Sequence, residues 1–453
     1  MKLNNISWSL GMIFTLASCS GFLDVKPDIK LIVPQTIKDA ELLLHDYTTL
    51  NTGYPNYGEL GTDDYYLTDD SWKAVSNLVQ RNAYNWIDES YVDPVQWQRP
   101  YKAVFVANQA LDVLAGLDAS EQNRALHDKL TGTALFFRAF AFHQLVEVFC
   151  PGYSSVIASA ELGIPLRLKP DLDENSVRAS LKDSYDQIIT DYRASIIKLP
   201  NQQNIIGQPD KAAAFAGLAR VYLAMGGYED AFVMADSCLT IKSDLLNFNL
   251  LRAADDLPIQ QFNEEVLFPA MSAGAGPMGY YTALVDMELY NSYDKLDLRK
   301  KIFFQLSDNI DGAYNFKGNY GGSYSQLFVG LTTSEVYLIK AEAAVRTGKI
   351  ESALESLNKL RYSRWKTEQY TAITESDPEL LLKIILEERR KELLFRGRRW
   401  SDLKRLNLDD RFQKTLTRIV NGKEFTLVPN SPKYAFRLPE TVINNGKISQ
   451  NKR

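Results

Sequence analysis

Apolar residues recur at helical spacing over most of the chain. Side chains three and four positions apart are apolar, as in Val104, Ala107 and Leu111, and this spacing places them on one face of an α-helix. Ser180 and Asp183 have the spacing of a helix-capping pair. The pattern predicts helices over residues 36–47, 101–117, 121–149, 175–199, 211–224, 229–241, 333–346, 351–362 and 378–396.

Two regions depart from the helical pattern. Residues 51–98 and 245–330 are rich in Asn, Gly, Asp and Tyr and show few helical periods. Between residues 421 and 443 we expect a small hairpin or coil, with a turn at 429–432. Extended or strand-like runs are expected at 163–166, 265–269, 301–304, 424–428 and 434–438. The predicted fold is therefore mostly α, with a loop-rich second part that contains little β.

Two of the predicted helix pairs share a turn. Gly226 precedes Ala231, and Gly348 precedes Ala353, in the same order of glycine, any residue, apolar residue, two further residues and alanine. A glycine allows the tight reversal, and a small alanine lets two helices approach closely. This is the turn of a tetratricopeptide-type pair. The pairs lie too far apart in sequence to form one solenoid by themselves, so residues 245–330 are expected to be an insertion on a helical scaffold.

The N-terminus has the pattern of a targeting segment. Lys2 precedes an apolar run from Ile6 to Leu16, which is too short to cross a bilayer. The order Leu16-Ala17-Ser18-Cys19 is typical of a lipoprotein cleavage site, so residues 1–18 are predicted to be removed and Cys19 to be acylated. A plain secretory signal with an incidental cysteine is the alternative. No later run of 18 apolar residues occurs, so Cys19 would be the only membrane anchor.

The composition removes several classes of function. The 453 residues include 51 basic and 56 acidic side chains, and a net charge of −5 gives no broad basic footprint for nucleic acid. Three histidines and three cysteines without a CxxC pair argue against a zinc site or a disulfide framework. In an oxidising compartment Cys150 and Cys238 could pair, although we expect two separately buried thiols.

Several sequence blocks together resemble one family, the SusD/RagB outer-membrane lipoproteins. The blocks are Cys19–Pro27, Arg81–Trp86, Trp97 with Tyr101 and Asn108, Arg138–Phe142, Gly163–Leu166, Val336–Ala343, Glu387–Leu393 with Trp400, and Pro439–Asn451. The resemblance implies a tetratricopeptide-type helical fold divided into a signal peptide (1–18), a helical region (19–244), a loop-rich insertion (245–330) and a C-terminal helical region (331–453).

The resemblance also implies a role. Such proteins are lids over a TonB-dependent outer-membrane transporter, the SusC-like partner, at the surface of Bacteroidota cells. They capture oligosaccharides, or in some members peptides, and carry no enzymatic activity. This chain departs from the family pattern at Arg396, where an acid is usual, and at Ser401, where an aromatic residue is usual.

Sugar binding uses flat apolar rings together with nearby carboxylates and amides, so exposed loop aromatics are the expected signature. The candidates come from two loop-rich segments: Asp64, Tyr66, Trp72, Tyr280, Tyr281, Tyr320 and Tyr324. The alternative for each tyrosine is packing of its loop onto the helices. The second segment is also a candidate contact for the transporter.

Other functions stay open at this point. A glycoside hydrolase needs two carboxylates about 5–10 Å apart, for which Asp63 and Asp64 are candidates. A pure tetratricopeptide interaction scaffold would bind the transporter and no small ligand. Interleaved acids and bases from Glu387 to Arg399 indicate a salt-linked helix rather than a phosphate site.

No metal or cofactor is expected from the sequence. His143 and Glu147 stand four apart on a helix without further histidine ligands. Asp308, Asn309 and Asp311 faintly resemble a calcium loop that lacks its closing glutamate, so structural calcium is the only ion considered.

Overall fold

A computed structural model describes residues 34–88, 94–171, 173 and 175–453. The predicted signal peptide and the predicted acylated Cys19 lie outside the described residues. No helix in these ranges is both long and apolar enough to cross a membrane.

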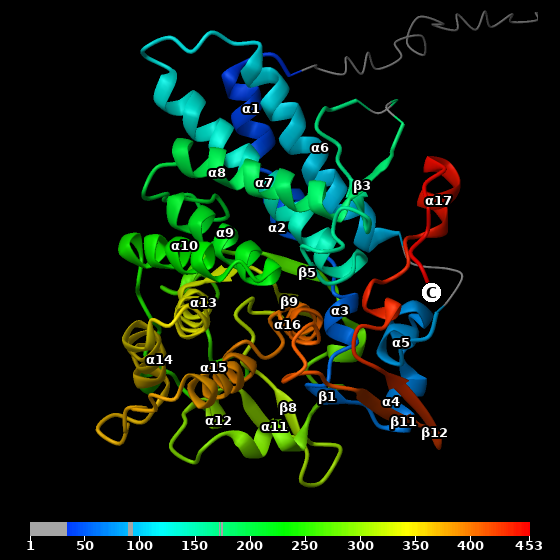
Figure 1. Cartoon of the computed structure of the whole chain (residues 1–453), viewed down its shortest axis with the longest axis vertical. Helices are drawn as coiled ribbons and strands as arrows, with labels where there is room; N and C mark the ends of the chain where they lie inside the picture. Colours follow the sequence, from blue (N-terminus) through cyan, green and yellow to red (C-terminus); the bar gives the residue numbers. More distant parts are fainter. Residues whose placement is uncertain (1–33, 89–93, 172, 174) are drawn as a thin grey trace, which may run out of the picture.

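Long helices form the scaffold of the molecule. They are stacked from α6, α7 and α8 at the top of Figure 1, through α9 and α10, to α13, α14 and α15 on its lower left. Each helix packs on the next as far as α13, and α14 and α15 both pack on α13. Their bounds are α6 Val95–Ala115, α7 Arg124–Phe149, α8 Leu181–Lys198, α9 Lys211–Met225, α10 Tyr228–Ile241, α13 Thr333–Arg346, α14 Ile350–Arg364 and α15 Pro378–Glu392. The mostly helical fold is confirmed.

The two tetratricopeptide-type turns are present. Gly226 and Gly348 have φ values of +75° and +77°, in the left-handed region that favours glycine. Ala231 and Ala353 are completely buried where the helices of each pair meet. The two pairs are also adjacent, because α10 packs against α13. The two pairs therefore share one stack, and the long connection between them leaves this stack and returns to it.

The start of α8 differs from the sequence prediction. Ser180 accepts a hydrogen bond from the Asp183 N–H at 3.0 Å and donates to the Asp183 carboxylate at 2.7 Å, as the spacing predicted. Residues 175–180 are not helical, however. The last three of them form β3 (Arg178–Ser180), which pairs with β2 (Leu162–Pro165). The Ser180 cap therefore marks the start of the helix, and the prediction of helix from residue 175 is wrong.

The N-terminal loop-rich region contains more helix than predicted. The helix predicted over 36–47 corresponds to α1 (Ile37–Leu44) and is followed by α2 (Tyr47–Asn51), whereas the predicted loop-rich region holds the short helices α3 Tyr57–Leu60, α4 Asp69–Ala74 and α5 Leu78–Tyr84. Side-chain caps explain two of them: Thr68 accepts from the Ser71 N–H and Asn77 accepts from the Gln80 N–H, each at 3.1 Å. These helices are too short for an apolar period to show in the sequence.

Strands within the described residues are short and occur in pairs, in agreement with the prediction of little β. The remaining partners are β1 (Tyr65–Tyr66) with β6 (Leu284–Val285), β4 (Val266–Phe268) with β10 (Leu331–Thr332), β5 (Met271–Gly274) with β9 (Gln326–Phe328), and β7 (Phe304–Leu306) with β8 (Tyr314–Phe316). Between them lie the 3₁₀ turn η3 (Gly276–Met278), α11 (Met287–Ser292) and α12 (Arg299–Ile302). The insertion thus pairs with strands from both flanking regions, while its boundaries at 245 and 330 stay a prediction.

The C-terminal hairpin is displaced from its predicted position. It consists of β11 (Leu416–Val420) and β12 (Lys423–Leu427), joined by a turn at Asn421 and Gly422. Both turn residues have positive φ, as a two-residue hairpin of this kind requires. The predicted second strand at 434–438 is wrong. The chain instead continues past α16 (Arg399–Leu406) and this hairpin to α17 (Glu440–Gly446).

Helix α15 is linked to the body by buried ion pairs, as the charge pattern predicted. The completely buried Arg299 contacts Glu388 at 2.5 Å and Glu392 at 3.0 Å. Arg364 contacts Glu392 at 2.8 Å and Glu265 at 2.6 Å. Buried guanidinium groups with complete carboxylate partners are structural rather than ligand-binding groups. Cys150 and Cys238 are separate, buried thiols, as expected.

Candidate ligand-binding surface

Three tyrosines of the insertion form a cluster at the surface. The Tyr280 ring packs edge-on against Tyr281, with ring centroids 4.6 Å apart, and against Tyr324, with centroids 5.0 Å apart. Tyr280 is 6% exposed, whereas Tyr281 and Tyr324 are 60% and 49% exposed. The cluster therefore has a buried central ring and two displayed outer rings.

Hydrogen bonds fix the central ring and its loop. The Tyr280 hydroxyl donates to Gln305 Oε1 at 2.7 Å, and the Tyr280 N–H donates to the Tyr324 carbonyl at 3.0 Å. Gln80 on α5 holds the start of the loop, because its amide donates to the Gly274 carbonyl at 2.7 Å and accepts from the Gly276 N–H at 3.1 Å. The tyrosine cluster, referred to below as the tyrosine platform, is thus anchored on α5 in the absence of a ligand and is preorganised for binding.

Polar groups border the tyrosine cluster. A hollow of about 270 Å³ is lined by Tyr280, Tyr324, Asn319, Ser323 and Gln326, among others. Flat rings beside amides and hydroxyls are the combination that binds sugar rings, since the rings cover the apolar C–H face and the polar groups bond hydroxyls.

Trp72 and Tyr66 lie on the adjoining elements. Trp72 on α4 is half-buried and stacks under the Arg81 guanidinium of α5, 4.9 Å from its ring centroid. Its Nε1 is buried without a hydrogen-bond partner in the described part of the chain. Tyr66 is half-buried on β1, opposite Leu284 of β6. Helix α5 therefore contacts both predicted ligand-binding segments: Arg81 stacks on Trp72 of the first, and Gln80 hydrogen-bonds to the loop of the second.

Two predicted site residues lie in the interior. Asp64 is 1% exposed, and its carboxylate accepts from Arg390 Nε at 2.8 Å. Tyr320 is completely buried, and its hydroxyl donates to Glu265 at 2.8 Å. A ligand at the surface does not reach either side chain, so both hold the insertion and β1 onto the helical body.

Asp63 and Asp64, the two carboxylates considered as hydrolase residues, both form ion pairs with arginines. Burial disfavours the charge of Asp63, but Arg399, at 2.7 Å, and Arg390 hold the pKa of Asp63 well below its usual range. Burial raises the pKa of Asp64, and the Arg390 charge opposes this shift. Both groups serve as ion-pair partners, which favours the binding interpretation over a hydrolase.

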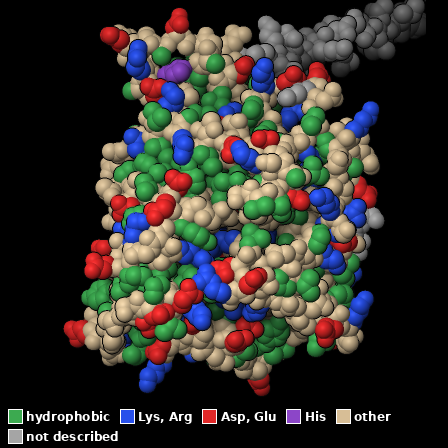
Figure 2. Space-filling view, in the orientation of Figure 1, with side chains coloured by type: hydrophobic (Ala, Val, Ile, Leu, Met, Phe, Trp, Pro, Cys, Tyr) green, Lys and Arg blue, Asp and Glu red, His purple; other side chains and the backbone are tan. Residues whose placement is uncertain are grey.

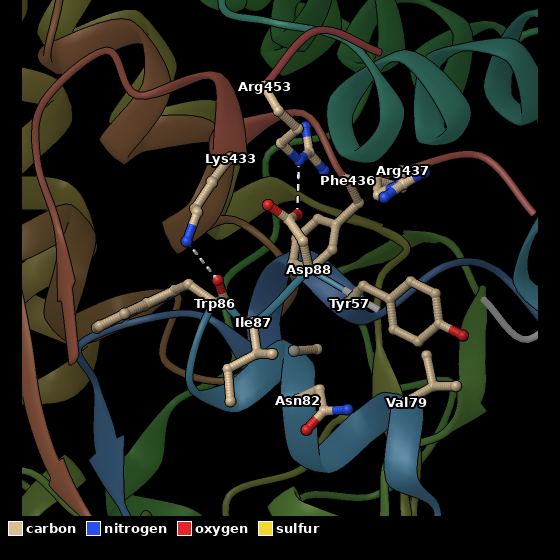
Figure 3. Close-up of a pocket in the computed structure, with 11 residues that line it drawn as sticks. Tyr57, Val79, Asn82, Trp86, Ile87, Asp88, Lys433, Phe436, Arg437 and Arg453 are labelled. Carbon is tan, nitrogen blue, oxygen red and sulfur yellow. Dashed lines mark hydrogen bonds and ion pairs between the residues drawn. The ribbon is translucent and has the colours of Figure 1, made fainter. Parts of the chain in front are cut away.

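A separate pocket lies between α5 and the C-terminal segment (Figure 3). It has a volume of about 450 Å³ and is lined by Tyr57, Val79, Asn82, Ala83, Trp86, Ile87, Asp88, Lys433, Phe436, Arg437 and Arg453. Sequence reasoning missed it, because its walls come from the two ends of the chain. The one signal was the presence of family blocks at both ends.

Metal ligands do not gather in the described residues, which contain no group of three or more His, Cys, Asp or Glu side chains able to hold an ion. His143 and Glu147 lie 3.7 Å apart in the core, and burial lowers the pKa of His143 to about 4. Asp308 and Asp311 lie in the exposed connection between β7 and β8.

On the face shown in Figure 2, acidic and basic side chains are mixed.

The described residues combine a stacked helical scaffold with a loop-rich insertion that displays two tyrosines at its surface. Two family models match the chain: one described as "Starch-binding associating with outer membrane" matches residues 21–223, and one described as "SusD family" matches residues 272–445. The chain belongs to the SusD family. The resemblance drawn from the sequence blocks is thereby confirmed.

Similar proteins of known sequence or structure agree with this assignment. SusD-like protein P2 of Formosa agariphila is 26% identical over 388 residues, covering 72% of this chain and 74% of that protein. A putative sugar-binding protein of Bacteroides vulgatus is 22% identical, with a TM-score of 0.76 over 92% of this chain and 99% of that chain. Surface glycan-binding protein A of Bacteroides uniformis is 16% identical, with a TM-score of 0.67 over 92% and 98%. At these identities the structural likeness establishes the fold.

Proposed function

We propose that the protein is a non-enzymatic, lipid-anchored receptor that captures oligosaccharides at the bacterial surface. In this proposal it partners a TonB-dependent outer-membrane transporter and delivers its ligand by moving as a lid over the channel. Acylation of Cys19 would attach it to the outer membrane. The observation that carries the proposal is the display of Tyr281 and Tyr324 on an anchored tyrosine platform.

Oligosaccharides are favoured over peptides by the chemistry of the platform. Two exposed rings with neighbouring amide groups suit stacking on pyranose faces. The family description, and the similarity to a putative sugar-binding protein and to a surface glycan-binding protein, support the same ligand class. Peptide binding is a second candidate only through the family resemblance.

Affinity electrophoresis of the purified mature protein tests the ligand class. The protein is run through gels that contain neutral polysaccharides, acidic polysaccharides or casein peptides, with bovine serum albumin as the unretarded reference. We expect at least one polysaccharide to slow migration. Retardation by casein peptides alone would assign the receptor to peptides, and release of reducing ends during the run would contradict a purely binding role.

A further inference from the structure

The pocket of Figure 3 combines apolar walls with an excess of positive charge. Rings and aliphatic groups of Tyr57, Val79, Trp86, Ile87 and Phe436 form most of its surface. Three basic side chains and a single acid line it among the described residues: Lys433, Arg437, Arg453 and Asp88. Such a pocket matches a ligand with one flat apolar face and a negative group.

The acid in this pocket already has a partner. Arg453 Nε lies 2.5 Å from Asp88 Oδ1. Lys433 Nζ donates to the Trp86 main-chain carbonyl at 3.0 Å, which is a neutral partner. Arg437 is half-buried and makes no hydrogen bond or ion pair with any described residue. Two cations of the pocket are thus left without a carboxylate among the described residues.

A second observation points to a ligand. Asn82 is 6% exposed, and its Nδ2 is buried without a hydrogen-bond partner in the described ranges. The amide lines the pocket on the side opposite Lys433 and Arg453 (Figure 3). A buried donor without an acceptor is destabilising, so a ligand oxygen at this point would relieve the deficit.

We infer that this pocket binds an acidic sugar unit, with its carboxylate or sulfate against Arg437 and Lys433. The inference rests on the proposed function and names the charge class of the saccharide. One ring face packs on Phe436 and Ile87, and a hydroxyl oxygen accepts from Asn82. Helix α5 contributes to both sites by different residues. Asn82 lines this pocket, whereas Gln80 hydrogen-bonds to the loop that carries the tyrosine cluster.

Isothermal titration of the full mature chain tests the inference with three probes. These are tetragalacturonate, its neutral methyl ester, and a sulfated galactose oligosaccharide of the same length. The variants are Arg437→Gln and Lys433→Gln. The matched controls are Arg124→Gln and Lys359→Gln, which remove exposed cations from the start of α7 and from α14.

We expect at least one anionic probe to bind about tenfold or more tightly than the methyl ester, since a charge-assisted hydrogen bond is worth about that factor. Arg437→Gln removes this preference, the controls keep it, and added salt weakens it. Binding of tetragalacturonate identifies the recognised anionic group as a carboxylate, and binding of the sulfated probe identifies it as a sulfate. Equal affinity for the neutral ester, or an unchanged preference in both pocket variants, overturns the inference. Binding of neutral probes would then leave the proposed function intact.

Discussion

Arg390 on α15 donates through Nε to the Asp64 carboxylate at 2.8 Å, although 326 residues separate them in the chain. The same guanidinium donates to the Asp63 carbonyl at 2.9 Å. This contact ties the strand that pairs with the insertion to the C-terminal helical region. Strand β1, which pairs with β6 of the insertion, is thereby fixed to the scaffold by an interior ion pair, in addition to the Gln80 hydrogen bonds that hold the tyrosine loop.

Removing one partner of this pair is expected to destabilise the fold. Arg390→Ala leaves Asp64 as a buried charge without its guanidinium, which costs about 3–5 kcal/mol of unfolding free energy. Arg390→Met combined with Asp64→Leu removes both charges and is expected to cost less than Arg390→Ala alone. Urea unfolding followed by circular dichroism measures both values. A double variant less stable than Arg390→Ala would contradict the pairing.

Glu59 provides a test by pH. Its two carboxyl oxygens are buried without hydrogen-bond partners among the described residues, and burial, reinforced by Asp64, raises its pKa well above 4.5. The folded protein therefore keeps this proton while the unfolded chain releases it, so stability decreases as pH rises above 4.5. Glu59→Gln removes that loss, and its unfolding midpoint relative to wild type is expected to rise between pH 5 and pH 8.

The control for this experiment is Glu355→Gln, an exposed acid on α14. Its unfolding midpoint should follow wild type at both pH values. An identical pH slope for wild type and Glu59→Gln would show that Glu59 is ionised in the folded protein.

Substitution of Trp72 tests whether this side chain contributes to oligosaccharide binding or only to the fold. Its ring stacks under Arg81 on the helix that holds the tyrosine loop. We expect Trp72→Ala to weaken oligosaccharide binding by roughly tenfold, as for the loss of one stacked aromatic contact, without unfolding the protein. Titration calorimetry and circular dichroism of the same sample measure both effects. Unchanged affinity would remove Trp72 from the site.

Local signals predicted much of the scaffold. The Ser180 cap, the Gly226 turn and the alternating charges of α15 act over a few residues, so they are readable in the sequence. The position of the C-terminal hairpin was also readable, because Asn421-Gly422 is a strong hairpin turn that the strand assignment overlooked. The hairpin position is therefore encoded locally, within the five residues on each side of this turn.

The candidate site was only partly predictable, and its tyrosines show why. Tyr320 and Tyr324 lie in the same glycine-rich stretch and look alike in sequence. Tyr320 is buried because Glu265 accepts its hydroxyl and the Arg396 guanidinium stacks 4.1 Å from its ring centroid. Tyr324 makes only one edge-on ring contact, with Tyr280, among the described residues and stays half exposed. Contacts across the fold, which local pattern does not encode, decide which aromatic ring is displayed.

The proposed lipid anchor at Cys19 is tested by a single substitution. Cys19→Ala removes the thiol that acylation requires, so we expect the protein to leave the membrane fraction and appear in the soluble fraction. Fractionation of cells that carry wild-type or variant protein, followed by immunoblotting, measures this. A variant that stays in the membrane fraction after a high-salt wash would contradict lipid anchoring through Cys19.

The most direct test of the central claim is the oligosaccharide affinity of a chain without its displayed tyrosines. Tyr281→Ala with Tyr324→Ala is titrated with the glycan that retards wild type, and the control is Tyr362→Ala, which removes a 63% exposed tyrosine from α14. Each lost stacking contact is worth about 1 kcal/mol, so we expect roughly a tenfold or larger loss in the double variant and wild-type affinity in the control. Equal affinities in all three proteins would contradict the tyrosine platform as the binding surface.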